Sequence, residues 1–131
     1  MYKDTGLEVN MANKYHSRKQ GLGDIYVIKV GEFYKIGSTR DLYGRFKTIQ
    51  VCNPTECTLI HSFKTNDMKL TEKLFHSLFA HNVARGEWFT LSDKDIAYIK
   101  AGQYSKAIAD SIGIIDDNRD SLDIVGNLLA V

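Results

Sequence analysis

Hydrophobic and polar residues change their pattern sharply at residue 23. Residues 1–22 are polar and show no clear period, and we interpret them as a flexible N-terminal arm. The next segments, IYVIKV at 25–30 and FYKIG at 33–37, are rich in β-branched and aromatic residues and are joined by Gly31-Glu32. Two such runs around a two-residue turn predict a tight β-hairpin, with Gly31 at the first central position of the turn.

The two-residue turn also predicts the register of the hairpin. Val30 should face Phe33, and Tyr26 should then face Gly37. Side chains alternate between the two faces of a strand, so the hairpin residues divide into two sets. One set is Tyr26, Ile28, Phe33 and Lys35, and the other is Ile25, Val27, Tyr34 and Ile36. Both sets are largely apolar, which predicts that other elements cover the hairpin on both sides.

Helical and extended patterns alternate in the rest of the chain. Leu42, Phe46 and Ile49 recur at helical spacing, after Ser38 or Asp41 as a cap and before Asn53-Pro54 as a stop. Residues 57–63 have the composition of a third strand. Asn66-Asp67 should cap a helix over 68–81, whose apolar stripe comprises Leu70, Leu74, Phe75, Leu78 and Phe79.

The C-terminal part completes the predicted order. Residues 87–91 favour a short final strand, and Ser92 or Asp93 should cap a last helix over about 93–111. Residues 113–131 carry four aspartates and could form a small helix or a frayed tail. The order is therefore β-β-α-β-α-β-α with an antiparallel hairpin first, which predicts a small α+β domain rather than a doubly wound parallel sheet.

Length and composition support a folded protein. The chain has 131 residues, 44% of them hydrophobic, with 7 Tyr and 6 Phe, which excludes global disorder and favours one domain with tails. No apolar run approaches the roughly 20 residues that span a bilayer, and the first residues lack the apolar core of a signal peptide. We therefore expect a soluble cytoplasmic protein with no membrane partner. The formal net charge of +1 does not by itself indicate nucleic acid as a partner.

The two cysteines have two interpretations. Cys52 and Cys57 fit a reduced structural pair in an intracellular protein better than a disulfide. A zinc site could also recruit His61 and His76, but the Cys-x4-Cys-x3-His spacing matches no common zinc site.

Two charged residues occupy unusual positions on the predicted helices. Arg45 lies about 60° from Leu42 and about 40° from Ile49 around its helix, which places it on the sheet-facing side. Glu72 lies about 20° from Phe79, at the edge of an apolar stripe, and His76 is four residues later on the same side. The structural alternatives are an arginine whose head reaches solvent and a glutamate at the rim of the stripe.

Tyr26 and Lys35 share one face of the hairpin near Gly37. A glycine opposite a tyrosine leaves space for a ligand or another backbone to approach, although a core tyrosine and a strand-edge lysine explain the pair when it is taken alone. Together with Arg45 and Glu72 they provide a phenol, two cations and a carboxylate. This combination suits a phosphodiester, because a cation on the carboxylate can polarise the phosphoryl oxygen and the arginine can stabilise transition-state charge.

These residues resemble the GIY-YIG nuclease superfamily. Asp24-Ile25-Tyr26 and Lys35-Ile36-Gly37 stand where that family has its two tripeptides, and Arg45 follows Gly37 by the eight residues that separate the family's glycine and catalytic arginine. The segment LTEKLFHSLF, with Glu72, followed by RGEWFTL, is similar to the small viral and phage branch. The resemblance covers about residues 23–91, so we divide the chain into an arm at 1–22, a nuclease domain at 23–91 and a C-terminal helix with an acidic tail at 92–131.

The resemblance implies an antiparallel sheet of about three strands flanked by helices, and Mg²⁺- or Mn²⁺-dependent hydrolysis of DNA. Tyr26 would be the general base, Arg45 would hold the scissile phosphate, and Glu72 would hold the single metal ion. Lys35 and His76 complete the implied catalytic set. The candidate substrate-binding residues follow the second tripeptide glycine and begin the next helix: Gly37, Ser38, Arg40, Tyr43 and Lys47. The implied setting is the cytoplasm of a bacterium or a phage-infected host cell.

The sequence departs from the family pattern at several positions. Asp24 replaces the first glycine, Lys35 replaces the second tyrosine, and Ile49 stands where many members have histidine or tyrosine. His76 could supply the missing group from another helix, and Glu87 or Trp88 lies nearest by order to the late asparagine of some members.

The departures keep a second interpretation open, a catalytically weak or inactive module that binds nucleic acid or a protein partner. A structural or regulatory protein of unrelated fold is a third interpretation.

Cutting both DNA strands with one site per chain would require a homodimer or two successive nicks. The charge is compatible with DNA, because residues 24–91 carry nine basic and seven acidic groups, whereas residues 92–131 carry four and seven.

Overall fold

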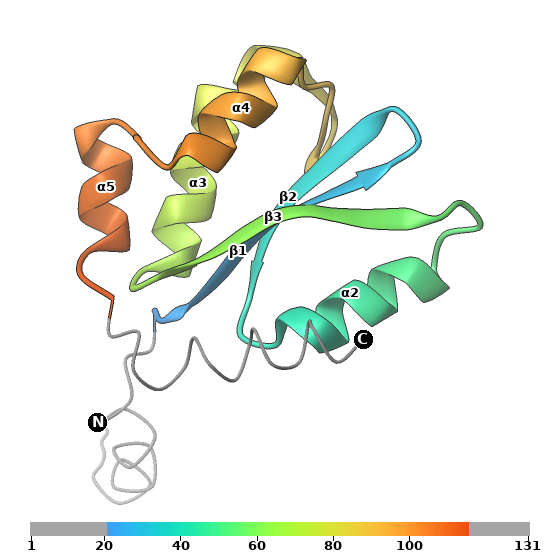
Figure 1. The fold of residues 1–131 in the computed structure, drawn as a ribbon, viewed down its shortest axis with the longest axis horizontal. Helices are drawn as coiled ribbons and strands as arrows, with labels where there is room; N and C mark the ends of the chain where they lie inside the picture. Colours follow the sequence, from blue (N-terminus) through green and yellow to red (C-terminus); the bar gives the residue numbers. More distant parts are fainter. Residues whose placement is uncertain (1–20, 116–131) are drawn as a thin grey trace, which may run out of the picture.

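The computed structural model describes residues 21–115 (Figure 1). The elements, in chain order, are β1 (Gly23–Val30), β2 (Phe33–Thr39), α2 (Leu42–Val51), β3 (Cys57–Thr65), α3 (Met68–Leu78), the 3-10 turn η1 (Ala80–Asn82), β4 (Val83–Arg85), β5 (Trp88–Phe89), α4 (Asp93–Ala101) and α5 (Lys106–Ile112). The predicted α+β class is confirmed. Most of the predicted arm, and residues 116–131 of the predicted acidic tail, lie outside the described residues.

The strands form one antiparallel sheet in the order β3-β1-β2-β5-β4. The predicted hairpin register is confirmed, because Val30 pairs with Phe33 and Tyr26 pairs with Gly37. Gly31 has φ +61, the positive value that its place in the turn requires. The alternation of β1 and β2 side chains between the two faces therefore follows the sequence.

The sheet is larger than the expected three strands. Residues 88–89 form β5 within the predicted strand at 87–91, and β5 pairs with β2 at Tyr34 and Lys35. Strand β4 then pairs with β5 at the edge. No local pattern predicts β4, because this strand has only three residues, all of them exposed, and so carries no burial pattern.

The predicted single helix over 93–111 is two helices. Helix α4 ends at Gly102, whose φ of +76 is the left-handed conformation that commonly terminates helices. Ser105 then caps α5 by accepting a hydrogen bond from the Ile108 amide. The other predicted helix starts are confirmed, since Asp41 caps α2 and Asp67 caps α3.

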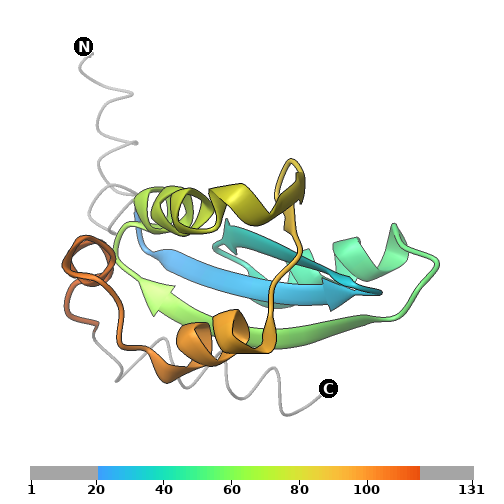
Figure 2. The same ribbon diagram turned by 90° about the horizontal axis from the view of Figure 1, so that it is seen from above.

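Helices cover both faces of the sheet (Figures 1 and 2). Helix α2 lies on one face, and α3, α4 and α5 lie on the other. The predicted packing on both sides of the hairpin is therefore confirmed. The smaller core on the α2 side comprises Tyr26, Ile28, Leu42, Ile49 and Cys57. The larger core on the α3 side comprises Ile25, Val27, Tyr34, Ile36, Phe75, Phe79, Phe89, Ile99 and Ile108.

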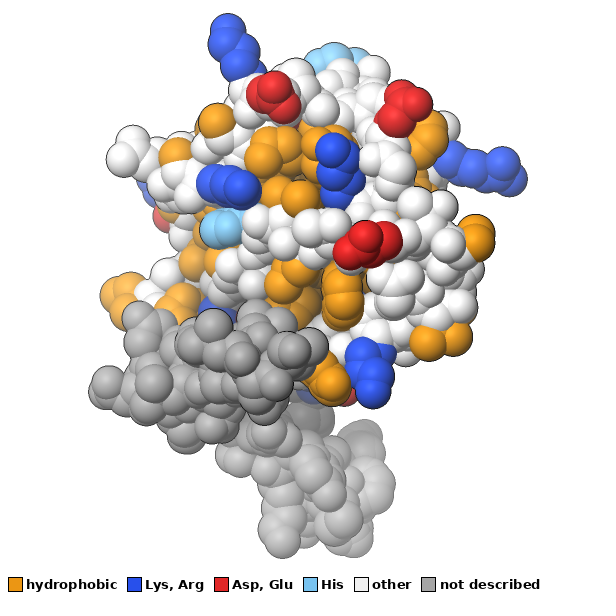
Figure 3. Space-filling model, turned by 45° about the vertical axis from the view of Figure 1, so that its right-hand side comes forward, with side chains coloured by type: hydrophobic (Ala, Val, Ile, Leu, Met, Phe, Trp, Pro, Cys, Tyr) orange, Lys and Arg blue, Asp and Glu red, His pale blue; other side chains and the backbone are white. Residues whose placement is uncertain are grey.

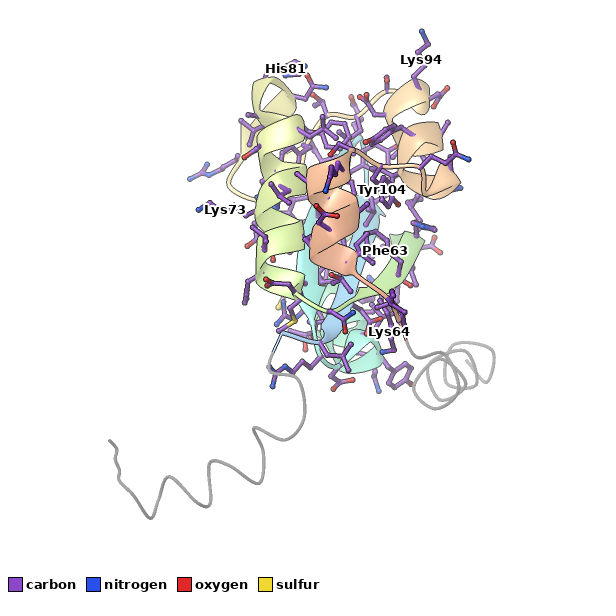
Figure 4. All side chains as sticks on the ribbon, turned by 90° about the vertical axis from the view of Figure 1, so that its left-hand side faces the viewer. Phe63, Lys64, Lys73, His81, Lys94 and Tyr104 are labelled. Atoms are coloured by element: carbon purple, nitrogen blue, oxygen red, sulfur yellow. The ribbon has the colours of Figure 1, made fainter. Side chains whose placement is uncertain are left out.

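Aromatic contacts connect α5 and its preceding loop to the larger core. The Tyr104 ring lies 5.6 Å from the Phe63 ring and 5.1 Å from the Phe75 ring, measured between centroids. Figure 4 shows Phe63 and Tyr104 on this side of the molecule. The Tyr104 hydroxyl donates to the Ile99 carbonyl. Burial, with a smaller contribution from Tyr98, raises the pKa of Tyr104 to about 12.

The apolar stripe of α3 differs in part from the prediction. Phe75 and Phe79 are buried, but Leu70 and Leu78 are exposed. Thr71 occupies the centre of the buried face instead and is fully buried. Hydrogen bonds satisfy its hydroxyl, which lies 2.7 Å from the Thr65 hydroxyl and 2.7 Å from the Ser111 hydroxyl. A polar residue can therefore join β3, α3 and α5 inside the core.

Replacing Thr71 with valine should lower the free energy of unfolding by about 1–2 kcal/mol, because the isosteric change removes the central hydroxyl of a buried network. Urea unfolding measures the change. Thr58→Val is the control, because Thr58 lies on the same strand as Thr65 but is exposed. Equal losses of stability in the two variants would contradict a special role for the buried network.

In the described part of the chain, no helix combines the length and apolar character needed to span a bilayer.

Candidate functional site

Tyr26 and Arg45 form a direct contact on the α2 side of the sheet. Tyr26 is in the middle of β1 and has no exposed surface. Arg45 follows the Asp41 cap in the first turn of α2, and its Nη1 atom donates to the Tyr26 hydroxyl oxygen at 3.3 Å. Arg45 is exposed as a residue, so its stem lies at the surface while its guanidinium reaches the core phenol. The sequence placed Arg45 toward the sheet, and this hydrogen bond is the contact that such a position allows.

Gly37 is in close contact with Tyr26. A Cβ atom at position 37 would lie 2.3 Å from the Tyr26 hydroxyl oxygen and 2.5 Å from Cζ. The space opposite Tyr26, which the sequence assigned to a ligand or a second backbone, is therefore filled by the Tyr26 ring itself. Gly37 allows this arrangement because it has no side chain.

Glu72 lies on the other side of the sheet, on α3. Its Oε1 atom accepts a hydrogen bond of 2.5 Å from the Ser38 hydroxyl, and its Oε2 atom is 3.6 Å from His76 Nε2. The interaction between Glu72 and His76 was expected from their spacing. The same His76 nitrogen is 2.8 Å from the Ile36 carbonyl oxygen. Because a carbonyl can only accept, Nε2 carries the proton that joins the ring to β2.

The Tyr26–Arg45 pair and the Glu72–His76 pair contact adjacent residues of β2. Tyr26 packs on Gly37, and the next residue, Ser38, binds Glu72. The phenol–guanidinium pair and the carboxylate–imidazole pair therefore contact one dipeptide from opposite faces of the strand. Strand β5 pairs with β2 only at Tyr34 and Lys35, so beyond Ile36 this edge of β2 has no neighbouring strand within residues 21–115.

Lys35 contacts a different set of residues. Its Nζ atom is 3.0 Å from Glu87 Oε1 and 5.4 Å from the centroid of the Trp88 ring. It shares the α2 face with Tyr26, two residues before Gly37. The sequence placed Glu87 near the family's late asparagine but did not predict its contact with Lys35, because the pairing of β2 with β5 brings the two together across 52 residues. No local pattern could have indicated that contact.

The remaining candidates extend from β2 onto the outer surface of α2. Ser38 is buried at Glu72, whereas Arg40, in the turn before α2, is exposed. Tyr43 and Lys47 are also exposed, and Lys47 Nζ lies 5.3 Å from the centroid of the Tyr43 ring. Together with Arg45, these residues bring three positive charges to α2 and the turn before it.

Asp24, which replaces the family glycine, has a structural partner. Its carboxylate lies 3.7 Å from Lys64 Nζ, and the two residues face each other across β1 and β3. Both side chains are largely buried. An acidic residue at position 24 is therefore balanced by a lysine on the neighbouring strand.

The cysteines are free, with Cys52 exposed and Cys57 buried. Burial, with a smaller contribution from Glu56, raises the pKa of the Cys57 thiol. Burial, with a smaller contribution from Lys100, lowers the pKa of His61. Among residues 21–115, no three His, Cys, Asp or Glu side chains gather closely enough to hold a metal ion. The zinc alternative therefore lacks a set of ligands, and a metal ion at Glu72 would need oxygen ligands from water or substrate.

Comparison with known protein families gives one match. The model of the T5orf172 domain matches residues 23–102. This domain is phage-associated and related to the GIY-YIG and HNH-like nucleases. No curated protein and no solved structure gives a significant match to the chain.

Proposed function

The chain belongs to the T5orf172 domain family, and we propose that it is a metal-dependent endonuclease that hydrolyses DNA by a GIY-YIG-type, one-metal mechanism. The observation that carries the proposal is the meeting of two groups at Gly37 and Ser38 of β2. Tyr26 and Arg45 form one group, and Glu72 with its partner His76 forms the other. A phenol, a guanidinium and a partly buried carboxylate can provide a general base, transition-state stabilisation and a metal ligand for phosphodiester hydrolysis.

Arg45 would bind the scissile phosphate. Arg45 is exposed as a residue, and one nitrogen of its guanidinium reaches Tyr26. A phosphate bound by Arg45 would therefore lie beside the Tyr26 hydroxyl, which could then accept a proton from the attacking water. Positive charge that is fixed in place before the reaction stabilises the extra negative charge of the transition state.

Glu72 would hold the metal ion. Ser38 fixes Oε1, while the contact of Oε2 with His76 is longer, at 3.6 Å, so Oε2 is the oxygen more readily offered to a cation. Mg²⁺ commonly binds to one or two protein carboxylates and completes its shell with water and substrate phosphate, so a single glutamate fits this ion. The bound ion would neutralise charge that develops on the phosphoryl oxygens.

His76 would act through Glu72, whereas Lys35 would contact the DNA itself. His76 Nε2 is bonded to the Ile36 carbonyl, which makes it a positioning residue for Glu72. Lys35 lies beside Tyr26 on the same face and is held by Glu87, so it would contact DNA next to the reacting phosphate. The exposed residues Arg40, Tyr43 and Lys47 would extend the contact with the DNA backbone.

Incubation of supercoiled plasmid and single-stranded DNA with Mg²⁺, Mn²⁺ or EDTA tests the proposal. We expect nicked plasmid with either metal and no product with EDTA, since one site in one chain cuts one strand at a time. Tyr26→Phe and Arg45→Ala should lose most of the activity, while Lys94→Ala, at an exposed position on α4, should retain it. Equal cleavage by all four proteins would overturn the assigned site.

A second candidate function is a module that binds DNA without cutting it. The observation that favours it is Ile49, which is buried in the smaller core and so provides no proton-transferring group. This alternative predicts a salt-dependent gel shift with no cleavage under either metal. Metal-dependent cleavage that Arg45→Ala abolishes would exclude it.

A further inference from the structure

A pocket lies on the α2 side of the sheet, beyond the proposed site. Its volume is about 380 Å³, and its lining residues are Val30, Phe33, Asn53, Ala84, Arg85 and Trp88. They come from the end of the β1–β2 hairpin, the loop after α2, and the β4–β5 pair. We refer to this space as the hairpin pocket. Figure 3 turns the right-hand side of Figure 1 forward and shows exposed hydrophobic side chains interspersed with Lys and Arg and with Asp and Glu.

The lining combines aromatic surface with a positive charge and an amide. Phe33 is 43% exposed, so a large part of its ring is open to a ligand. Trp88 is partly buried, and Lys35 Nζ lies 5.4 Å from the centroid of its ring. Arg85 is exposed. The Asn53 side-chain nitrogen donates to the Ile49 carbonyl at 2.7 Å, which fixes the orientation of the amide.

The hairpin pocket continues the row of residues that begins at the proposed site. Phe33, Lys35 and Gly37 alternate onto the same face of β2, and Tyr26 packs on Gly37. Phe33 and Gly37 are four residues apart on β2, which is a distance of about 13 Å. A DNA strand bound at the proposed site would therefore reach the hairpin pocket within a few nucleotides. Lys35 lies between the two and would contact a phosphate of the connecting backbone in exchange for part of its contact with Glu87.

We propose that the hairpin pocket holds one unstacked nucleobase of the DNA strand whose phosphate is bound at Arg45. Aromatic side chains stack on bases of any identity, and neighbouring cations track the phosphates. Arg85 is an exposed cation in the lining, and Lys35, whose charge is shared with Glu87, lies at the Trp88 ring. A cation at an aromatic surface favours a nucleic acid over an apolar protein segment. This inference rests on the proposed function for the position of the strand, and it adds a preference for DNA with unpaired nucleotides beside the cleavage site.

Trp88 makes the proposal directly measurable, because it is the only tryptophan in the chain. Its fluorescence should fall when a short single-stranded oligonucleotide is added in EDTA, where metal-dependent cleavage does not occur. An abasic strand of the same length and charge should cause little change. Quenching by both strands to the same extent, or by neither, would overturn the proposal. A protein segment would be the better ligand if no oligonucleotide quenches the fluorescence.

A pair of variants separates stacking from other effects. Phe33→Ala should weaken oligonucleotide binding by about fivefold or more at constant salt. Leu78→Ala is the matched control, because Leu78 is 42% exposed but lies on α3. Equal affinities of Phe33→Ala and the unmodified protein would overturn the proposal. Base-dependent quenching without cleavage under any metal would support the hairpin pocket and refute only the endonuclease activity. Cleavage with base-independent quenching would support the endonuclease activity and refute only the hairpin pocket.

Discussion

Glu72→Gln is expected to lower metal-dependent DNA cleavage by at least about 100-fold, because the amide cannot replace the anionic ligand of the proposed metal ion. Glutamine keeps an oxygen that can accept the hydrogen bond from the Ser38 hydroxyl. The substitution is nearly isosteric, so the thermal unfolding temperature should change little. Initial rates of plasmid nicking across a range of Mg²⁺ concentrations measure the effect.

Glu32→Gln provides the matched control for this experiment. Glu32 is exposed in the turn of the β1–β2 hairpin, so its replacement removes the same charge from a surface position. It should nick plasmid at the rate of the unmodified protein. Nicking by Glu72→Gln at the rate of Glu32→Gln would show that Glu72 does not hold the ion.

Gly37→Ala is expected to lower the free energy of unfolding by about 1–3 kcal/mol, because an added methyl group overpacks a filled core. The new Cβ would lie 2.3 Å from the Tyr26 hydroxyl oxygen and 2.5 Å from Cζ. Either the buried ring or β2 must move, and both movements disturb the contact between Tyr26 and Arg45. Cleavage should therefore fall together with stability. Urea unfolding and plasmid nicking measure the two effects.

A double-mutant cycle tests whether Tyr26 is the cause of this loss. Tyr26→Leu removes the ring atoms that the methyl group would meet, so Gly37→Ala should cost much less in that background. The interaction energy between the two substitutions should then be of the same order as the loss in the single Gly37→Ala variant. Strictly additive effects would show that the destabilisation arises elsewhere.

Local sequence patterns predict much of this fold. The two-residue turn at Gly31 determines the register of β1 and β2, and the alternation of apolar residues shows that both faces are covered. Asp41 and Asp67 indicate where helices begin, because their side chains accept hydrogen bonds from the first turn. What the patterns missed depends on long-range contacts or on very short elements, as for β4 and the buried Thr71.

In the candidate site, too, local patterns predict some contacts and miss those that are distant in the sequence. Helical spacing predicts that Glu72 and His76 lie close together, and helical angles place Arg45 toward the sheet. The bond between Ser38 and Glu72 connects residues 34 positions apart, and the contact between Lys35 and Glu87 connects residues 52 apart. No local periodicity encodes such contacts. These contacts form because the fold places α3 and β5 beside β2.

The unequal distribution of helices over the sheet has a consequence for motion. Among residues 21–115, α2 is the only helix on its face, whereas α3 shares the opposite face with α4 and α5. A helix held by fewer neighbours opens at lower free energy, so amide hydrogens of α2 should exchange with solvent before those of α3. Arg45 lies on α2, and Glu72 lies on α3. Mild heating would therefore release the guanidinium while the carboxylate stays in place, and the proposed DNA cleavage would be lost below the melting temperature.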